Sequence, residues 1–363
     1  MPFEDEAPAV TRFTAAAAYG MRQNLERTPR PNSASRCSRR RRGRDAPRGS
    51  RSRRVTGYLL RRLSYSLVAF WGVLTIVFGL LHITGDPAAL LAGDLGTADV
   101  VQQIRHAYGL DRPLPVQYLE FLGQIARGDF GYSYRQSLPV LELIGGHIGP
   151  TIELAVSALV VTVLVGVPLG VVAGANRGSA LDTSAMLASL FGLSVPSFWL
   201  GLMLIVVFGV LLGWLPVSGY GGLHHLVMPA LVLGSFEAAQ LSRLTRTGLL
   251  EVLAEDYVRT ARAKGLAPRL VLLKHALRNA ALPMLTIVGF GFGRMLGGAV
   301  VVETIFAWPG MGRLGVQAVL ARDFPVVLGT VVVGAAIFLA VNLLVDVTYG
   351  WIDPRLRTGA ADA

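Results

Sequence analysis

The sequence predicts an all-α membrane protein with six transmembrane helices. Of the 363 residues, 52% are hydrophobic and only 16% are charged, whereas a soluble domain carries about 25% charged residues. The chain also contains 42 glycines, and glycine is more frequent in membrane helices than in soluble ones. Apolar stretches of about 20 residues, the length that crosses a bilayer, recur from residue 63 onward.

Six segments are expected to span the membrane. The third is too long for one straight span, so a break is expected near Pro196. The fourth contains Glu237, the fifth Arg294 and the sixth Asn342. The expected spans are 63–83, 154–175, 183–215, 226–242, 280–302 and 324–345.

The distribution of Lys and Arg between the connections predicts the orientation. Residues 1–62 hold 16 arginines against five acids, and the rest of the chain holds 18 basic and 18 acidic residues, so the net charge of +11 belongs to the N-terminal tail. The connection between spans 4 and 5 has eight basic residues against three acidic ones, whereas residues 85–150 have four against seven. Six spans with both termini in the cytoplasm place every basic connection inside.

Four regions are expected besides the spans themselves. Residues 1–54 are rich in Arg, Ser and Pro and predict a disordered cytoplasmic tail, because they hold too few large apolar residues to offset the entropy of ordering. Attraction to anionic lipid headgroups is the alternative role for this tail. Within the transmembrane domain, 55–357, the segment 85–150 is too long for a simple connector and is interpreted as an external helical subdomain. A cytoplasmic loop covers 247–282, and 358–363 form a C-terminal tail.

Several kinds of chemistry are disfavoured. The single cysteine, Cys37, excludes an internal disulfide and a zinc site built on cysteine pairs. Neither lysine, Lys264 or Lys274, follows a glycine, so the phosphate-binding loop G-x-x-x-x-G-K-[ST] is absent. No nucleophile–base set is evident, so no catalytic residue is assigned. No metal site is expected either, because none of the scattered histidines pairs at i, i+4: His82, His224, His225 and His275.

The cytoplasmic loop contains a pattern typical of a short helix. Asp256 is expected to cap a helix over 257–264, and Gly265 stands where a terminating glycine belongs. Pro268 is then expected to open the next helix in its first turn. The apolar side chains Val258, Ala261 and Leu266 are expected to contact something other than this chain. A solvated basic loop is the alternative.

Two ionisable residues inside the spans are candidates for function, because a charge within the membrane is costly. Glu237 and Arg294 lie at depths of ~16 Å and ~12 Å from the outer ends of their spans, at 1.5 Å per residue. They can pair, or line a polar cavity that holds peptide termini. Three glycines at four-residue spacing in span 5, Gly289, Gly293 and Gly297, are interpreted as sites of close helix packing rather than as a gating hinge.

The cytoplasmic loop resembles the EAA loop of bacterial ABC-transporter permeases. Arg259-Thr260-Ala261 stands where that motif has Glu-Ala-Ala, Gly265 is the motif glycine, and Leu282-Pro283 matches the closing Leu-Pro at a longer spacing. YVRTARAKGL and this spacing are similar to the peptide/nickel branch. Further matching pieces, in order, are LLRRL (59–63), GLDRPLPVQY (109–118), GDFGYS (128–133), SVPSFWLG (194–201), LPVSGY (215–220), VVETIFAWPGMGRL (301–314) and DVTYGWIDPRLR (346–357).

Taken together, these pieces resemble the first permease subunit of dipeptide/oligopeptide importers over about residues 57–357. The resemblance implies half of a translocation pathway in the bacterial cytoplasmic membrane, paired with a second homologous permease. Two ATPase subunits would bind ATP and Mg²⁺ and dock on the cytoplasmic helix, and an extracytoplasmic binding protein would deliver substrate. No cofactor is expected on this chain. The residues assigned to ATPase coupling are Asp256, Tyr257, Arg259, Thr260, Ala261, Arg262, Lys264 and Gly265.

Other functions are weaker alternatives. Glutathione and nickel chelates fit the same branch as peptides. An ion-driven secondary transporter is disfavoured because no clear internal repeat is found and intramembrane acids are few. An intramembrane enzyme lacks a catalytic constellation, and nucleic-acid binding by the tail would be only nonspecific.

Overall fold

The computed structural model describes residues 49–83, 88, 97–107 and 109–352. Their secondary structure is helical apart from one isolated bridge between Tyr132 and Pro139. The chain divides into two compact units, residues 1–54 and 55–363, and the description below concerns the second. Most of the predicted N-terminal tail and all of 358–363 lie outside the described residues.

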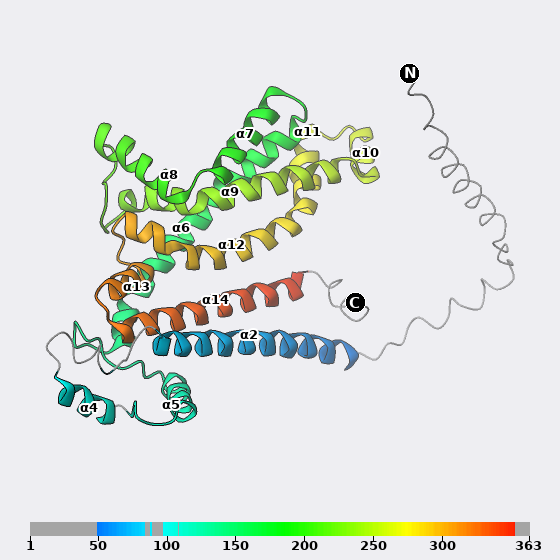
Figure 1. Ribbon diagram of the computed structural model, residues 1–363. Helices are drawn as coiled ribbons and strands as arrows, with labels where there is room; N and C mark the ends of the chain where they lie inside the picture. Colours follow the sequence, from blue (N-terminus) through cyan, green and yellow to red (C-terminus); the bar gives the residue numbers. More distant parts are fainter. Residues whose placement is uncertain (1–48, 84–87, 89–96, 108, 353–363) are drawn as a thin grey trace, which may run out of the picture. The chain divides into compact units, whose positions relative to one another are not determined.

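Four of the described helices are long and apolar enough to cross a membrane. They cover the first, second, fifth and sixth predicted spans (Figure 1). The second is longer than predicted, because it begins at Val140 and so takes in the end of the segment assigned to the external subdomain. The four helices are α2 (Gly49–Ile83), α6 (Val140–Ala175), α12 (Leu277–Ile305) and α14 (Phe324–Ile352).

The third predicted span is broken at the expected place. Helix α7 (Ala180–Ser194) ends just before Pro196, which caps α8 (Ser197–Leu204), and α8 continues as the π-helix η3 (Ile205–Leu211). The helix axis bends by 105° at the break between α7 and the continuous arm formed by α8 and η3. Proline lacks the N–H that a continuous helix needs and pushes the preceding residue toward extended backbone, which accounts for the break. The pair qualifies as a broken span or a re-entrant loop.

Helix α9 (Leu223–Leu253) covers the fourth predicted span and lies alongside α6 (Figure 1). It is not among the four helices above, and it carries Glu237, Arg243 and Arg246. Glycines let α6 and α9 approach closely. A Cβ added at Gly170 of α6 would lie 2.4 Å from the carbonyl oxygen of Ser242, a distance no real Cβ adopts. Small residues at helix contacts are a typical packing device of membrane proteins.

The glycines of span 5 partly confirm the packing interpretation. A Cβ at Gly289 would lie 2.6 Å from a methyl of Val345, and one at Gly293 would lie 3.1 Å from Oδ1 of Asn342. Both therefore sit where α12 meets α14. Gly297, in contrast, faces open space, with nothing within 4 Å of an added Cβ, so its role is not close packing in this chain.

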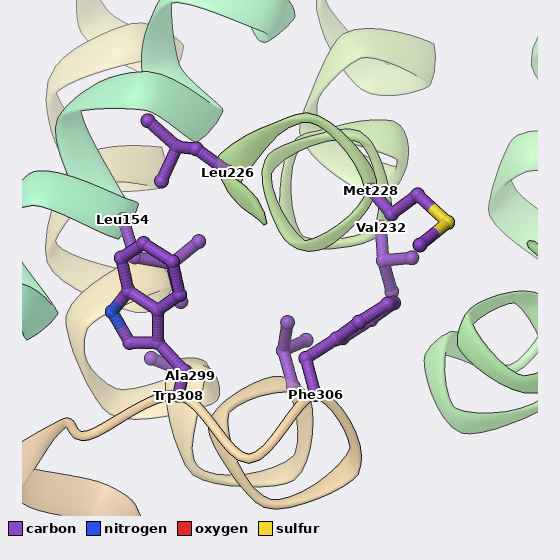
Figure 2. Packing of buried hydrophobic residues seen from close by; sticks show 8 residues of the cluster. Leu154, Leu226, Met228, Val232, Ala299, Phe306 and Trp308 are labelled. Atoms are coloured by element: carbon purple, nitrogen blue, oxygen red, sulfur yellow. The ribbon is translucent and has the colours of Figure 1, made fainter. Parts of the chain in front are cut away.

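A large apolar cluster joins α6, α9 and α12 near the end of α12 (Figure 2). Trp308 and Phe306 are 1% exposed and are among its bulkiest members. The indole Nε1 of Trp308 donates to the carbonyl of Pro150 at 2.9 Å, so the one polar atom of this ring is satisfied. Leu154 of α6 and Met228 of α9 complete the contact between the three helices.

Where it is described, the segment between α2 and α6 contains two helices, α4 (Ala98–Ala107) and α5 (Leu114–Ala126), and turns and bends over 127–139. Phe121 of α5 packs against Leu74 of α2 and Val332 of α14. A further short helix, α13 (Met311–Leu320), precedes α14. Asp323, between α13 and α14, accepts hydrogen bonds from Ser133 Oγ at 2.5 Å and from the backbone N–H of Tyr134 at 3.2 Å. These bonds fasten the segment to the start of α14.

Candidate functional site

The predicted cytoplasmic helix is present as α10 (Asp256–Ala263), between the end of α9 and the turn α11 (Pro268–Leu270). Glu255, not Asp256, is the capping residue, so the predicted cap is wrong by one residue. Asp256 is the first helical residue, where a carboxylate still favours the positive end of the helix dipole. Its carboxylate lies 3.3 Å from the guanidinium of Arg259 in an exposed ion pair.

The predicted end of this helix is confirmed. Lys264 is the C-cap, and Gly265 follows with a φ of +76°. This left-handed conformation is open to glycine at little cost and is the usual way a helix is terminated. Pro268 begins α11, as predicted.

The apolar face of α10 is buried by the chain itself. Val258 is fully buried and Ala261 is 8% exposed. They pack with Leu266 and with Val271, which opens the π-helix η4 (Val271–Ala276). The prediction that these side chains contact another protein is therefore wrong. The chain folds back after Gly265, and η4 supplies the apolar partner that the linear sequence did not reveal.

The rest of the surface of α10 is exposed and polar. It presents two cationic side chains, Arg259 and Arg262, and the hydroxyl of Thr260. The hydroxyl of Tyr257 accepts a hydrogen bond from Nδ2 of Asn279 at 2.6 Å, which ties the start of α10 to α12. Helix α10 is therefore held to the rest of the chain by its buried apolar side chains and by the bond of Tyr257, while its arginines remain exposed.

The two ionisable residues of the spans form an ion pair. Nε and Nη2 of Arg294 on α12 lie 2.9 and 2.7 Å from the two carboxylate oxygens of Glu237 on α9. Nη2 also donates to Oε1 of Gln240 at 3.2 Å. The Glu237 side chain is 6% exposed, whereas that of Arg294 is 50% exposed. A carboxylate with so little access to water is stable when a cation pairs with it in this two-pronged geometry.

Helix α12 makes room for the buried carboxylate with a glycine. A Cβ at Gly291 would lie 2.9 Å from Oε2 of Glu237. The polar pair is therefore embedded between α9 and α12, with only the arginine reaching the surface of the chain.

Two family models of membrane transport components together match most of the chain from residue 55 to residue 358. One, described as the binding-protein-dependent transport system inner membrane component, matches residues 166–358, and the corresponding N-terminal model matches 55–155. The chain belongs to this family. It is an inner-membrane permease subunit of an ABC importer, a transport component whose family works with ATPase subunits and substrate-binding proteins.

Curated relatives of the permease match over almost their whole length. A putative peptide transport system permease protein of Brucella abortus is 43% identical over 84% of this chain and 99% of its own. A probable peptide ABC transporter permease protein of Sinorhizobium fredii is 41% identical over 83% and 99%. The glutathione transport system permease protein of Escherichia coli is 41% identical over 84% and 99%.

Among solved structures, an inward-facing methionine ABC transporter resembles the permease with a TM-score of 0.51 at 19% identity. The match covers 59% of this chain and 97% of the other. At this identity the likeness concerns the fold, and it agrees with the all-helical architecture.

A second ion pair joins α9 to α7 in the permease. Arg246, near the end of α9, donates from Nε and Nη2 to the two oxygens of Asp182 on α7, at 2.6 and 2.8 Å. The backbone N–H of Gly178 adds a third bond to this carboxylate at 3.0 Å. The hydrogen bonds to Asp182 raise the pKa of Arg246 above its ordinary value. The sequence reasoning missed this pair, because 64 residues separate its members.

A third polar centre was also missed. Glu303 of α12 is fully buried. It accepts hydrogen bonds from Oγ1 of Thr151 at 2.6 Å and from the backbone N–H of Arg313 at 2.9 Å. Gly310 leaves room for its carboxylate, since an added Cβ would lie 2.1 Å from Oε1. The acid and the glycine of the run VVETIFAWPGMGRL were a usable signal for this contact.

Metal binding has no candidate in the described part of the permease, where no group of three or more His, Cys, Asp and Glu side chains is placed to hold an ion. His224 and His225 stack with ring centroids 5.4 Å apart, but no acid joins them in such a group.

Proposed function

We propose that the permease forms half of the translocation pathway of a peptide importer, together with a second homologous permease. The names of the relatives in Brucella and Sinorhizobium support peptides as the substrate class. In this proposal α9 and the bent pair α7–α8 join the four strongly apolar helices, which gives six spans with both termini in the cytoplasm. Glu237 and Arg294 then line the pathway.

The two faces of α10 carry the coupling part of the proposal. Burial of Val258 and Ala261 against the chain makes the helix a rigid part of the permease. Its exposed basic face is then available for one of two ATPase subunits, which bind ATP and Mg²⁺. A helix joined in this way to α9 and α12 transmits a displacement of the ATPase to the spanning helices. ATP can bias the permease only if the contacts of α10 differ between the inward and outward states.

A substrate-binding protein completes the proposed importer. It meets the permease at the extracytoplasmic face, which includes α4, α5 and the segment fastened by Asp323. The small net negative charge of the segment 85–150 fits its placement outside.

The function is tested by reconstituting the permease in proteoliposomes together with the second permease, the ATPase subunits and the binding protein. We expect uptake of labelled peptide that requires ATP on the cytoplasmic side and the loaded binding protein. Uptake by the permease alone, driven by an ion gradient, would instead support a secondary transporter.

Glutathione is a second candidate substrate, favoured by the relative in Escherichia coli. Competition between unlabelled glutathione and a labelled dipeptide in the same vesicles separates the two. Peptide uptake that resists an excess of glutathione supports the first proposal.

A further inference from the structure

Arg294 is placed where an arginine cannot face lipid at low cost. It lies inside a helix apolar enough to span the membrane, and half of its side chain is exposed on this chain. Its neighbours on the same face, Phe290 and Val301, are exposed apolar side chains. A charge at such a depth requires water or another polar group beside it. The surface around Arg294 therefore meets a water-filled path or a polar ligand.

Glu237 determines how the guanidinium is presented. Its two oxygens take the Nε–H and one N–H of Nη2, and Gln240 takes the other N–H of Nη2. Both N–H groups of Nη1 have no hydrogen-bond partner among the described residues. The guanidinium is thus held in place from the protein side and keeps the two N–H donors of Nη1, which point in different directions because they share one nitrogen.

We infer that Nη1 of Arg294 binds a carboxylate of the transported peptide. The inference rests on the proposed function and names a selectivity-determining residue for it. An N–H of Nη1 can donate a charge-assisted hydrogen bond to one oxygen of a carboxylate, and such a bond is about twice as strong as a neutral one.

Glu237 acts as a positioning residue in this arrangement. Because it neutralises Arg294, the site offers directed donors without a large net positive charge. A substrate anion is therefore recognised and still released, whereas an unpaired arginine would hold it more tightly. Gly291 supports the arrangement by admitting the carboxylate of Glu237 between the helices.

The test compares two peptides that differ only at the C-terminus, a free acid and its amide. The complete importer is reconstituted in vesicles and supplied with saturating binding protein already loaded with one or the other peptide. Differences in turnover then arise after delivery. For the wild type we expect faster turnover of the acid, by about tenfold if one charged hydrogen bond is lost with the amide. In Arg294→Gln this acid-to-amide ratio falls to about one.

A second variant is needed, because Arg294→Gln leaves Glu237 buried without its cation. The double variant Glu237→Gln/Arg294→Gln removes both charges and keeps a polar side chain at both positions. It is also expected to show no preference for the acid. In the single variant Glu237→Gln the arginine stays without its counter-ion and holds the acid more tightly, so turnover of the acid slows and the acid-to-amide ratio falls below the wild-type value. Thr304→Val, an exposed position on the same helix whose hydroxyl bonds its own backbone, is the control and keeps the wild-type ratio.

The outcomes separate the inference from the function. If the wild type carries neither peptide, the proposed function fails. If all variants carry both peptides with the wild-type ratio, the function stands and the inference is overturned. If Arg294→Gln and the double variant Glu237→Gln/Arg294→Gln both fail to copurify with the second permease, Arg294 is an assembly contact. The inference is then likewise overturned.

Discussion

Arg246 of α9 and Asp182 of α7 join these two helices through a two-pronged ion pair, with N–O distances of 2.6 and 2.8 Å. The pair anchors the end of α9, from which α10 projects, to the beginning of α7. In the proposed coupling, a displacement of the end of α9 is therefore expected to reach α7 as well.

Removing this anchor is expected to uncouple transport from ATP hydrolysis. Arg246→Ala frees the end of α9, so α10 can move without α7. We expect peptide carried per ATP hydrolysed to fall about fivefold, the lower range of typical coupling between sites, while the complex still assembles. Measurement of uptake and phosphate release in the same vesicles gives the ratio. The control is Arg243→Ala, an exposed arginine one turn earlier on α9. An unchanged ratio for Arg246→Ala would show that the pair is not part of the transmission.

A second prediction concerns Gly265, whose φ of +76° allows the sharp exit from α10. A β-branched residue in this conformation costs about 1–2 kcal/mol. We expect Gly265→Val to shift α10 relative to η4 and to abolish peptide-stimulated ATP hydrolysis, while the permease still inserts in the membrane. Gly145→Ala, on α6 with nothing within 4 Å of the added Cβ, is the matched control. Normal stimulation in Gly265→Val would argue against α10 as the coupling element.

The exposed arginines of α10 give a third prediction. Arg259→Glu/Arg262→Glu reverses the charge of the outer face without touching Val258 or Ala261. The fold is expected to persist, because both arginines are exposed, and the ATPase subunits are expected to be lost during purification. Copurification followed by gel analysis measures this. Arg135→Glu, on the opposite face of the proposed topology, is expected to retain the ATPases. Retention in both variants would mean that the ATPases bind elsewhere.

Close approach of α6 and α9 leads to a fourth prediction. Gly170→Leu places atoms where Ser242 O and the side chain of Thr245 already lie. Overpacking of this kind costs about 1–3 kcal/mol, so the melting temperature of the purified permease should fall. Gly145→Ala again serves as the control. Equal melting temperatures would mean that the two helices are further apart than described.

The sequence predicted those features that depend on local pattern. The length and hydropathy of the apolar runs predicted the four helices that are long and apolar enough to cross a membrane, and Pro196 predicted the break between α7 and α8. Gly265 after a short amphipathic stretch predicted the end of α10. Glu237 and Arg294 were predicted as possible partners because each is an isolated charge at a similar depth, and the structure pairs them.

Features that depend on distant parts of the chain were not predicted. The partner of Glu303 is Thr151, 152 residues away, and neither periodicity nor charge pattern joins them. The burial of Val258 was misjudged for a related reason. An amphipathic helix shows that an apolar face needs a partner, but not whether η4 or another protein supplies it.

Glu303 gives the last prediction, because its carboxylate receives donors from two elements while fully buried. Glu303→Ala leaves the hydroxyl of Thr151 and the N–H of Arg313 without their acceptor and opens a cavity, so we expect a loss of about 2–5 kcal/mol in stability. Glu303→Gln keeps the volume and one acceptor oxygen but turns an amide group toward another donor, and about 1–3 kcal/mol should be lost. Thermal unfolding of the purified permease ranks the two variants against Thr304→Val, one residue further along α12, which should melt like the wild type.

Because Gly310 and Thr151 lie against the same carboxylate, Gly310→Ala should destabilise the wild type through a clash and should cost less when combined with Glu303→Ala. Additive losses in that double variant would show that Gly310 and Glu303 do not share one site.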